Sequence, residues 1–113
     1  MKKISLLLIT MFGTSSIMFG YEHTIINFTN HEAYVRANKL WGGYKSKDVP
    51  AARGGDFGKA SINMGGICTN SFDVRSSLGR QKKGVGGNKC SGRTVYINYK
   101  DANTKQGIEI SID

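Results

Sequence analysis

The stretch 94–113, TVYINYKDANTKQGIEISID, decides the fold class of this chain. Val95, Ile97 and Tyr99 alternate with the more polar residues at 94, 96, 98 and 100. The isoleucines at 108, 110 and 112 alternate in the same way with polar residues at 109, 111 and 113. Alternation with a period of two is typical of half-buried β-strands. The segment between the two runs, 101–106, is polar apart from Ala102, and Gly107 after it can adopt a positive φ. The pattern therefore predicts an antiparallel hairpin with a longer loop.

The same alternation recurs toward the N-terminus. It predicts four further short strands, at residues 24–29, 33–38, 60–64 and 71–75. No window predicts an amphipathic helix longer than two turns, and the 15 glycines also disfavour helices. We therefore expect an all-β chain, a small single-domain antiparallel β-sandwich or small barrel of about six strands. In this arrangement we expect residues 24–29 to form an exposed sheet edge that could pair with a partner strand.

Two glycine-rich segments, 41–58 and 76–92, interrupt the strand pattern and are predicted to be long loops. Loops of this length are uncommon in compact domains and are usually functional or disordered. Neither an internal repeat nor a linker is visible, so the pattern indicates one folded domain.

Residues 1–20 have the layout of a bacterial-type signal peptide. Lys2 and Lys3 precede an almost unbroken apolar run at 4–12, and residues 13–20 are small and mildly polar. Cleavage is expected after Ser16 or Gly20, which leaves a domain of about residues 21–113. The competing interpretation, an uncleaved anchor, is disfavoured because a spanning helix needs about 20 apolar residues and residues 13–16 interrupt this run.

The chain has two cysteines, Cys68 and Cys90, and an export signal places them in an oxidising compartment. We therefore predict one disulfide between them and a secreted or periplasmic location. Closing a ring of this size would stabilise the fold by about 3 kcal/mol. No further apolar stretch follows the signal, so no transmembrane segment is expected after its removal.

The remaining chain is basic. Without Lys2 and Lys3 it carries 14 Lys and Arg against 8 Asp and Glu, a net charge of +6. A positive surface attracts anionic partners. The partners expected from this charge are an anionic glycan, a lipid head group or a protein surface, while the oligomeric state does not follow from the sequence.

The second glycine-rich segment concentrates this charge. It contains the four cations Arg80, Lys82, Lys83 and Lys89, which we take as candidate ligand-binding residues. Glycines leave backbone N–H groups open to an anion. The spacing of a phosphate-binding P-loop is absent and no helix follows, so no nucleotide is expected.

Two aromatic residues in the first glycine-rich segment are also candidates. Trp41 and Tyr44 could stack on a sugar ring or a base. In so small a domain Trp41 is favoured as part of the core, because aromatic side chains dominate small cores, and Tyr44 is the better candidate for exposure.

No catalytic, metal or cofactor motif stands out. A weak copper or nickel site would arise at His23 if the mature chain began at Tyr21, since a third-position imidazole can complete a square-planar ligand set. A small secreted nuclease would need a carboxylate base, a histidine acid and a cationic clamp. The residues available for those roles are Glu22, His23, His31, Glu32 and Arg36.

The sequence therefore favours a non-enzymatic binding module without a cofactor, which recognises an anionic, glycan or protein surface through its basic glycine-rich loops. Two alternatives stay open. One is a small secreted hydrolase or toxin that acts on nucleic acid or cell wall, and the other is a protein inhibitor that presents a disulfide-braced loop.

Overall fold

The computed structural model describes residues 21–113, and the predicted signal segment and its cleavage point lie outside this range. The described chain forms eight β-strands and no helix, so it has no helix that could cross a membrane. The strands are β1 Glu22–Asn27, β2 Ala33–Lys39, β3 Tyr44–Val49, β4 Gly58–Asn63, β5 Thr69–Ser76, β6 Gly79–Gly84, β7 Thr94–Asp101 and β8 Gln106–Ile112.

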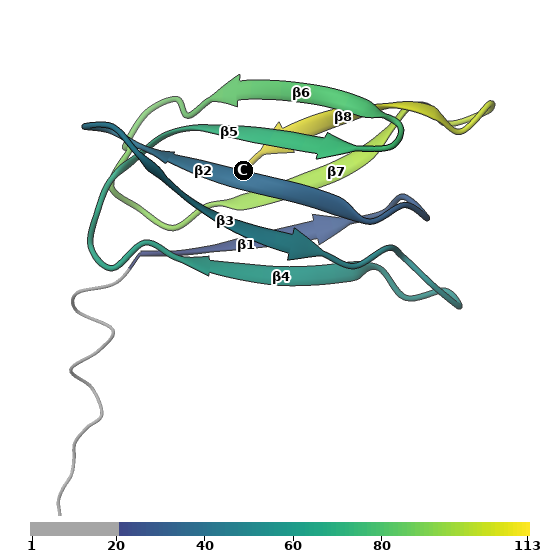
Figure 1. Cartoon of the computed structure of the whole chain (residues 1–113), viewed down its shortest axis with the longest axis horizontal. Helices are drawn as coiled ribbons and strands as arrows, with labels where there is room; N and C mark the ends of the chain where they lie inside the picture. The colour runs from purple at the N-terminus through teal and green to yellow at the C-terminus, as the bar shows by residue number, and fades with distance from the viewer. Residues whose placement is uncertain (1–20) are drawn as a thin grey trace, which may run out of the picture.

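The strands form two four-stranded sheets that face each other (Figure 1). One sheet has the order β4-β1-β7-β8 and the other β3-β2-β5-β6. Every pair is antiparallel except β1 and β7, which are parallel. The predicted all-β sandwich is confirmed, as is the β7–β8 hairpin, in which Gly107 has a φ of 68°.

The core lies between the sheets and is made of the apolar residues that the alternation picks out. Phe72 is its largest fully buried side chain. It is surrounded by the apolar residues of both inner faces, among them Ile25, Val35, Ala37, Val74, Val95, Ile97, Ile108 and Ile110. Because successive residues of a strand point to opposite faces, the residues between these positions form the two outer faces.

Two predictions about the strands were wrong. The segments 41–58 and 76–92 are not loops throughout, because they contain β3 and β6. Both are edge strands that are largely exposed and rich in cations, so they lack the apolar alternation by which strands are recognised. The expected edge at residues 24–29 is also wrong, since β1 lies inside its sheet between β4 and β7.

At one side of the sandwich, side chains of β6 cover the edge of β8. Gln81 Oε1 accepts a hydrogen bond from the Ile110 N–H. Lys83 Nζ donates to the Ile110 carbonyl oxygen at 3.5 Å. Both backbone groups of Ile110 are thus bonded within the molecule and are not open to pairing with another chain.

Candidate functional site: the outer face of the β3-β2-β5-β6 sheet

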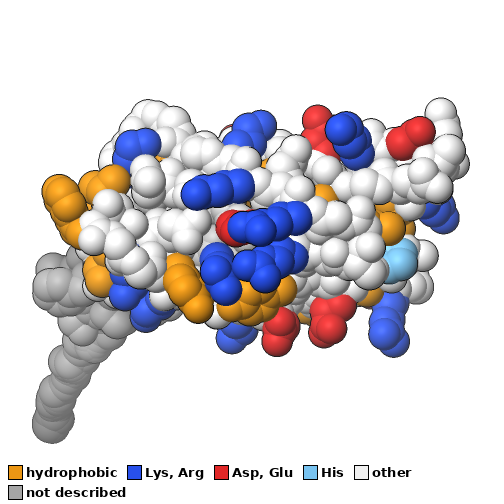
Figure 2. All heavy atoms as spheres, turned by 45° about the horizontal axis from the view of Figure 1, so that its top comes forward, with side chains coloured by type: hydrophobic (Ala, Val, Ile, Leu, Met, Phe, Trp, Pro, Cys, Tyr) orange, Lys and Arg blue, Asp and Glu red, His pale blue; other side chains and the backbone are white. Residues whose placement is uncertain are grey.

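The outer face of the β3-β2-β5-β6 sheet carries polar side chains in rows, which we call the cation face. Strand register places Arg36, Asp73 and Lys82 in one row. The next row holds Asp48, Tyr34, Arg75 and Arg80. Adjacent strands are about 4.8 Å apart, so the four cations of these two rows surround Asp73. Figure 2 shows Lys and Arg side chains gathered around an acidic one on the face that it presents.

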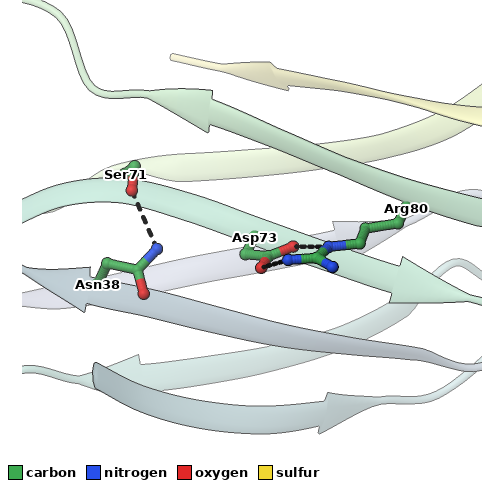
Figure 3. A network of polar contacts seen from close by, with 4 residues as sticks. All are labelled: Asn38, Ser71, Asp73 and Arg80. Carbon is green, nitrogen blue, oxygen red and sulfur yellow. Dashed lines mark hydrogen bonds and ion pairs between the residues drawn. The ribbon is translucent and has the colours of Figure 1, made fainter. Parts of the chain in front are cut away.

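Asp73 is only 5% exposed although it belongs to an outer face. Its carboxylate accepts two hydrogen bonds from Arg80, one from Nη2 at 2.9 Å and one from Nε at 3.2 Å (Figure 3). This fork geometry is the strongest form of an Arg–carboxylate contact. The pair neutralises Arg80 in part and leaves Arg36, Arg75 and Lys82 without a carboxylate partner among residues 21–113.

A second polar contact lies beside this pair. Asn38 Nδ2 donates a hydrogen bond to Ser71 Oγ at 2.9 Å, across the β2–β5 pair (Figure 3). The two residues belong to the row that also contains Tyr44, so amide and hydroxyl groups border the cations on one side.

Arg36 is held over two tyrosine rings. Its guanidinium carbon lies 4.3 Å from the centroid of Tyr44 and 5.6 Å from that of Tyr34. Such contacts fix a cation over the face of an aromatic ring. The polar side chains of Ser46 and then Arg36 lower the pKa of the Tyr34 phenol, and Tyr34 in turn raises the pKa of the Arg36 guanidinium. The cation is thus positioned without being neutralised.

The cations of this face are not arranged for maximal stability. The Nε atoms of Arg36 and Arg75 are shielded from solvent and have no hydrogen-bond partner, a feature shared with Arg93 at one end of the domain. A buried donor without a partner costs free energy of folding. Crowding of like charges on one face adds to that cost.

The structure divides the four basic residues singled out by the sequence. Arg80 and Lys82 lie on the cation face. Lys83 points to the opposite side, where it donates to Ile110, and Lys89 Nζ donates to the Val85 carbonyl oxygen at 2.6 Å. The latter two are therefore engaged within the molecule.

Sequence reasoning passed over Arg75 and Tyr34 and considered Arg36 only as part of a nuclease. The alternation within β2 and β5 already places all three on an outer face. It does not reveal that the two strands are neighbours, because their pairing joins residues almost 40 positions apart.

The two aromatic candidates have different surroundings. Tyr44 is 46% exposed, as predicted, and lies on the cation face beside Arg36. Trp41 is 88% exposed, so the favoured core role for it was wrong. It lies in the turn between β2 and β3 and not among the rows of the sheet, because the chain leaves β2 at Lys39.

The predicted disulfide is present between Cys68 and Cys90, whose Cα atoms are 4.3 Å apart. His23 is completely buried and contacts Thr69, the residue after Cys68. The Arg93 N–H donates to His23 Nδ1 at 3.0 Å, so Nε2 carries the proton and donates to Thr69 Oγ1 at 2.7 Å. Burial, and secondly the charge of Arg93, lower the His23 pKa from 6.5 to about 4.

No group of three His, Cys, Asp or Glu residues within 21–113 could hold a metal ion. The copper site suggested at His23 would use the Nδ1 atom that here accepts from Arg93. It also depends on a cleavage point outside the described residues and stays a prediction.

The residues considered for a nuclease are not brought together. His23 contacts Thr69, at the start of β5, whereas His31 Nδ1 is 2.9 Å from Ser77 Oγ, just beyond the end of β5. The two histidines therefore lie at opposite ends of the domain. Arg36 lies on the cation face, between them.

Comparison with known proteins adds no relationship: no protein-family model matches this chain, and no curated protein is significantly similar to it.

Proposed function

We propose that the chain is an exported, non-enzymatic binding module that recognises an anionic glycan through the cation face. The observation that supports this most directly is the set Arg36, Arg75 and Lys82, three cations on one sheet face around a carboxylate that Arg80 already occupies. Sulfate, phosphate and carboxylate groups of a glycan are acceptors that match guanidinium and ammonium donors.

The tyrosines give this face a second kind of contact. Tyr44 is about half exposed and its ring is already fixed by Arg36. A rigid aromatic ring offers a large contact area at little cost in conformational entropy. Tyr44 could therefore pack against a sugar ring while the cations bind its acidic substituents, a combination that suits a glycan better than a simple anion.

The test is binding to heparin, a sulfated glycan, by the protein and by a variant that carries Arg36→Gln, Arg75→Gln and Lys82→Gln. We expect the variant to lose at least about tenfold in affinity and to show a weaker salt dependence, since screened charge–charge contacts are removed. Arg80 is left in place because its loss would leave the buried Asp73 carboxylate without its partner. Affinity is measured by titration calorimetry at several salt concentrations.

The matched control removes three exposed cations elsewhere, through Lys59→Gln, Lys100→Gln and Lys105→Gln. It lowers the net charge equally but leaves the cation face intact. Equal losses in the two triple variants would show that only net charge matters and would overturn the proposal. Circular dichroism confirms that both variants are folded.

A further inference from the structure

The turn between β2 and β3 presents an isolated tryptophan to solvent. Trp41 is 88% exposed, whereas a tryptophan of a small domain is ordinarily among its most buried side chains. Residues 40–43 close the turn, with hydrogen bonds from Lys39 N–H to the Gly43 carbonyl and from Gly42 N–H to the Lys39 carbonyl. Gly42 and Gly43 have φ angles of 112° and 79°, which glycine adopts without strain.

This turn is anchored to the part of the molecule that carries the disulfide. The Leu40 N–H donates to the Cys68 carbonyl at 3.0 Å, and Cys68 is bonded to Cys90. The neighbouring Thr69 N–H donates to the Lys89 carbonyl at 2.9 Å. Three connections, at 40–43, 64–68 and 85–93, are thereby joined at one end of the sandwich, so Trp41 projects from a braced base.

The residues next to this turn in the chain carry charge of one sign. From Arg36 to Lys47 the chain has four cations and no acidic residue. Lys39 flanks the turn on one strand and Lys45 on the other, and the register pairs Lys45 with Ala37 near the end of β2. Figure 2 shows hydrophobic side chains at the left end of the molecule, with Lys and Arg side chains close by.

We propose that this end of the molecule docks on a bilayer containing anionic lipids, with Trp41 inserted at the level of the head groups. Tryptophan prefers the membrane–water interface, where its ring is buried and its N–H stays near polar groups. A Lys near an anionic membrane strengthens binding roughly fivefold. Lys39 and Lys45, on the two strands that flank Trp41, would supply this attraction to the anionic head groups. This inference does not rest on the glycan-binding role of the cation face, because it uses a different part of the molecule.

Trp41 is the only tryptophan in the chain, so its fluorescence reports on this turn alone. The full chain is titrated with vesicles of phosphatidylglycerol and phosphatidylcholine, and with vesicles of phosphatidylcholine only. We expect the emission to shift to shorter wavelength with the anionic vesicles, and lipids brominated near the head group to quench it more than lipids brominated deep in the chains. A chain that sediments with the vesicles while its emission stays unchanged would overturn the proposal.

Sedimentation with the anionic vesicles then tests two variants. We expect Trp41→Ala to reduce partitioning roughly tenfold, and Lys39→Gln with Lys45→Gln to reduce it by more than tenfold. The control is Phe57→Ala, which removes another exposed aromatic side chain, 48% exposed, from the opposite end of the sandwich. All chains carry the same residues 1–20, so any lipid binding by that segment is common to them. Equal partitioning of Trp41→Ala and the wild-type chain would overturn the proposal.

Discussion

Replacement of Gly58 by alanine is expected to destabilise the fold by at least about 3 kcal/mol, or to prevent folding. A Cβ atom at this position would lie 1.7 Å from the carbonyl oxygen of Pro50. The clash is with backbone, so it cannot be relieved by rotation of a side chain. The free energy of unfolding, measured by urea denaturation, checks this.

The surroundings of Gly58 explain why the chain cannot move aside there. Gly58 pairs with Asn27 in the β1–β4 register. Asn27 is fully buried, and its Nδ2 donates to the carbonyl oxygens of Pro50 at 3.2 Å and His31 at 2.8 Å. A displaced Pro50 would lose this bond and leave a buried donor without one of its partners.

Gly84→Ala is the matched control for Gly58. Gly84 ends β6, and a Cβ atom there would meet nothing within 4 Å. We expect its free energy of unfolding to change by less than about 1 kcal/mol. If the two alanine variants were equally stable, the close approach of Pro50 to β4 would be wrong.

Gly58 also shows which parts of the fold the sequence can predict. In the sequence it is one of several glycines of the segment 41–58, with nothing to distinguish it. Its role comes from Pro50, eight residues earlier, which passes over the start of β4. Contacts of this kind depend on the path of the chain and leave no periodic pattern.

The inner strands, by contrast, could be predicted because burial of one face imposes the alternation. The edge strands could not. In β3 only Val49 is buried, and β6 reads Gly-Arg-Gln-Lys-Lys-Gly, so neither strand has an apolar face to recognise. Charged edge strands protect a sheet from pairing with other chains, and the same property hides them from pattern analysis.

The candidate site was predicted in part for the same reason. Local sequence drew attention to Arg80, Lys82 and Tyr44 because cations and glycines cluster in the two long segments. The cation face needs the β2–β5 pairing, which brings Arg36 beside Asp73. Only the register shows that these cations share one surface and that Lys83, opposite the buried Phe72, does not belong to it. Lys89 lies outside the strands and donates to the Val85 carbonyl oxygen.

The titration of His23 is expected to lower the free energy of unfolding by about 3 kcal/mol as the pH falls from about 6.5 to 4. Burial lowers the folded-state pKa of His23 from 6.5 to about 4. Between these values the unfolded chain binds a proton that the folded chain does not, so the free energy of unfolding decreases with decreasing pH. Well above pH 6.5 the contribution is complete and constant.

The measurement is urea unfolding at several pH values for the wild-type chain and for His23→Gln. The variant has no titrating group at this position. Between pH 6.5 and 4 we therefore expect its free energy of unfolding to fall by about 3 kcal/mol less than that of the wild-type chain. His31→Gln, which replaces a histidine outside the core, is the control for the substitution itself. Identical slopes for wild type and His23→Gln would contradict the buried, neutral state of His23.

The effect of protonation should begin at the braced end of the sandwich. A protonated Nδ1 cannot accept the hydrogen bond from the Arg93 N–H, which connects β1 to the segment 85–93. That segment carries Cys90, and through Cys68 it supports the turn that presents Trp41. The protection factor of the Arg93 amide, the ratio of its intrinsic to its observed exchange rate at each pH, should therefore fall at acidic pH before protection in the β2–β5 pair does. If protection fell at both places together, His23 would act on global stability only, and the end that carries Trp41 would not loosen separately.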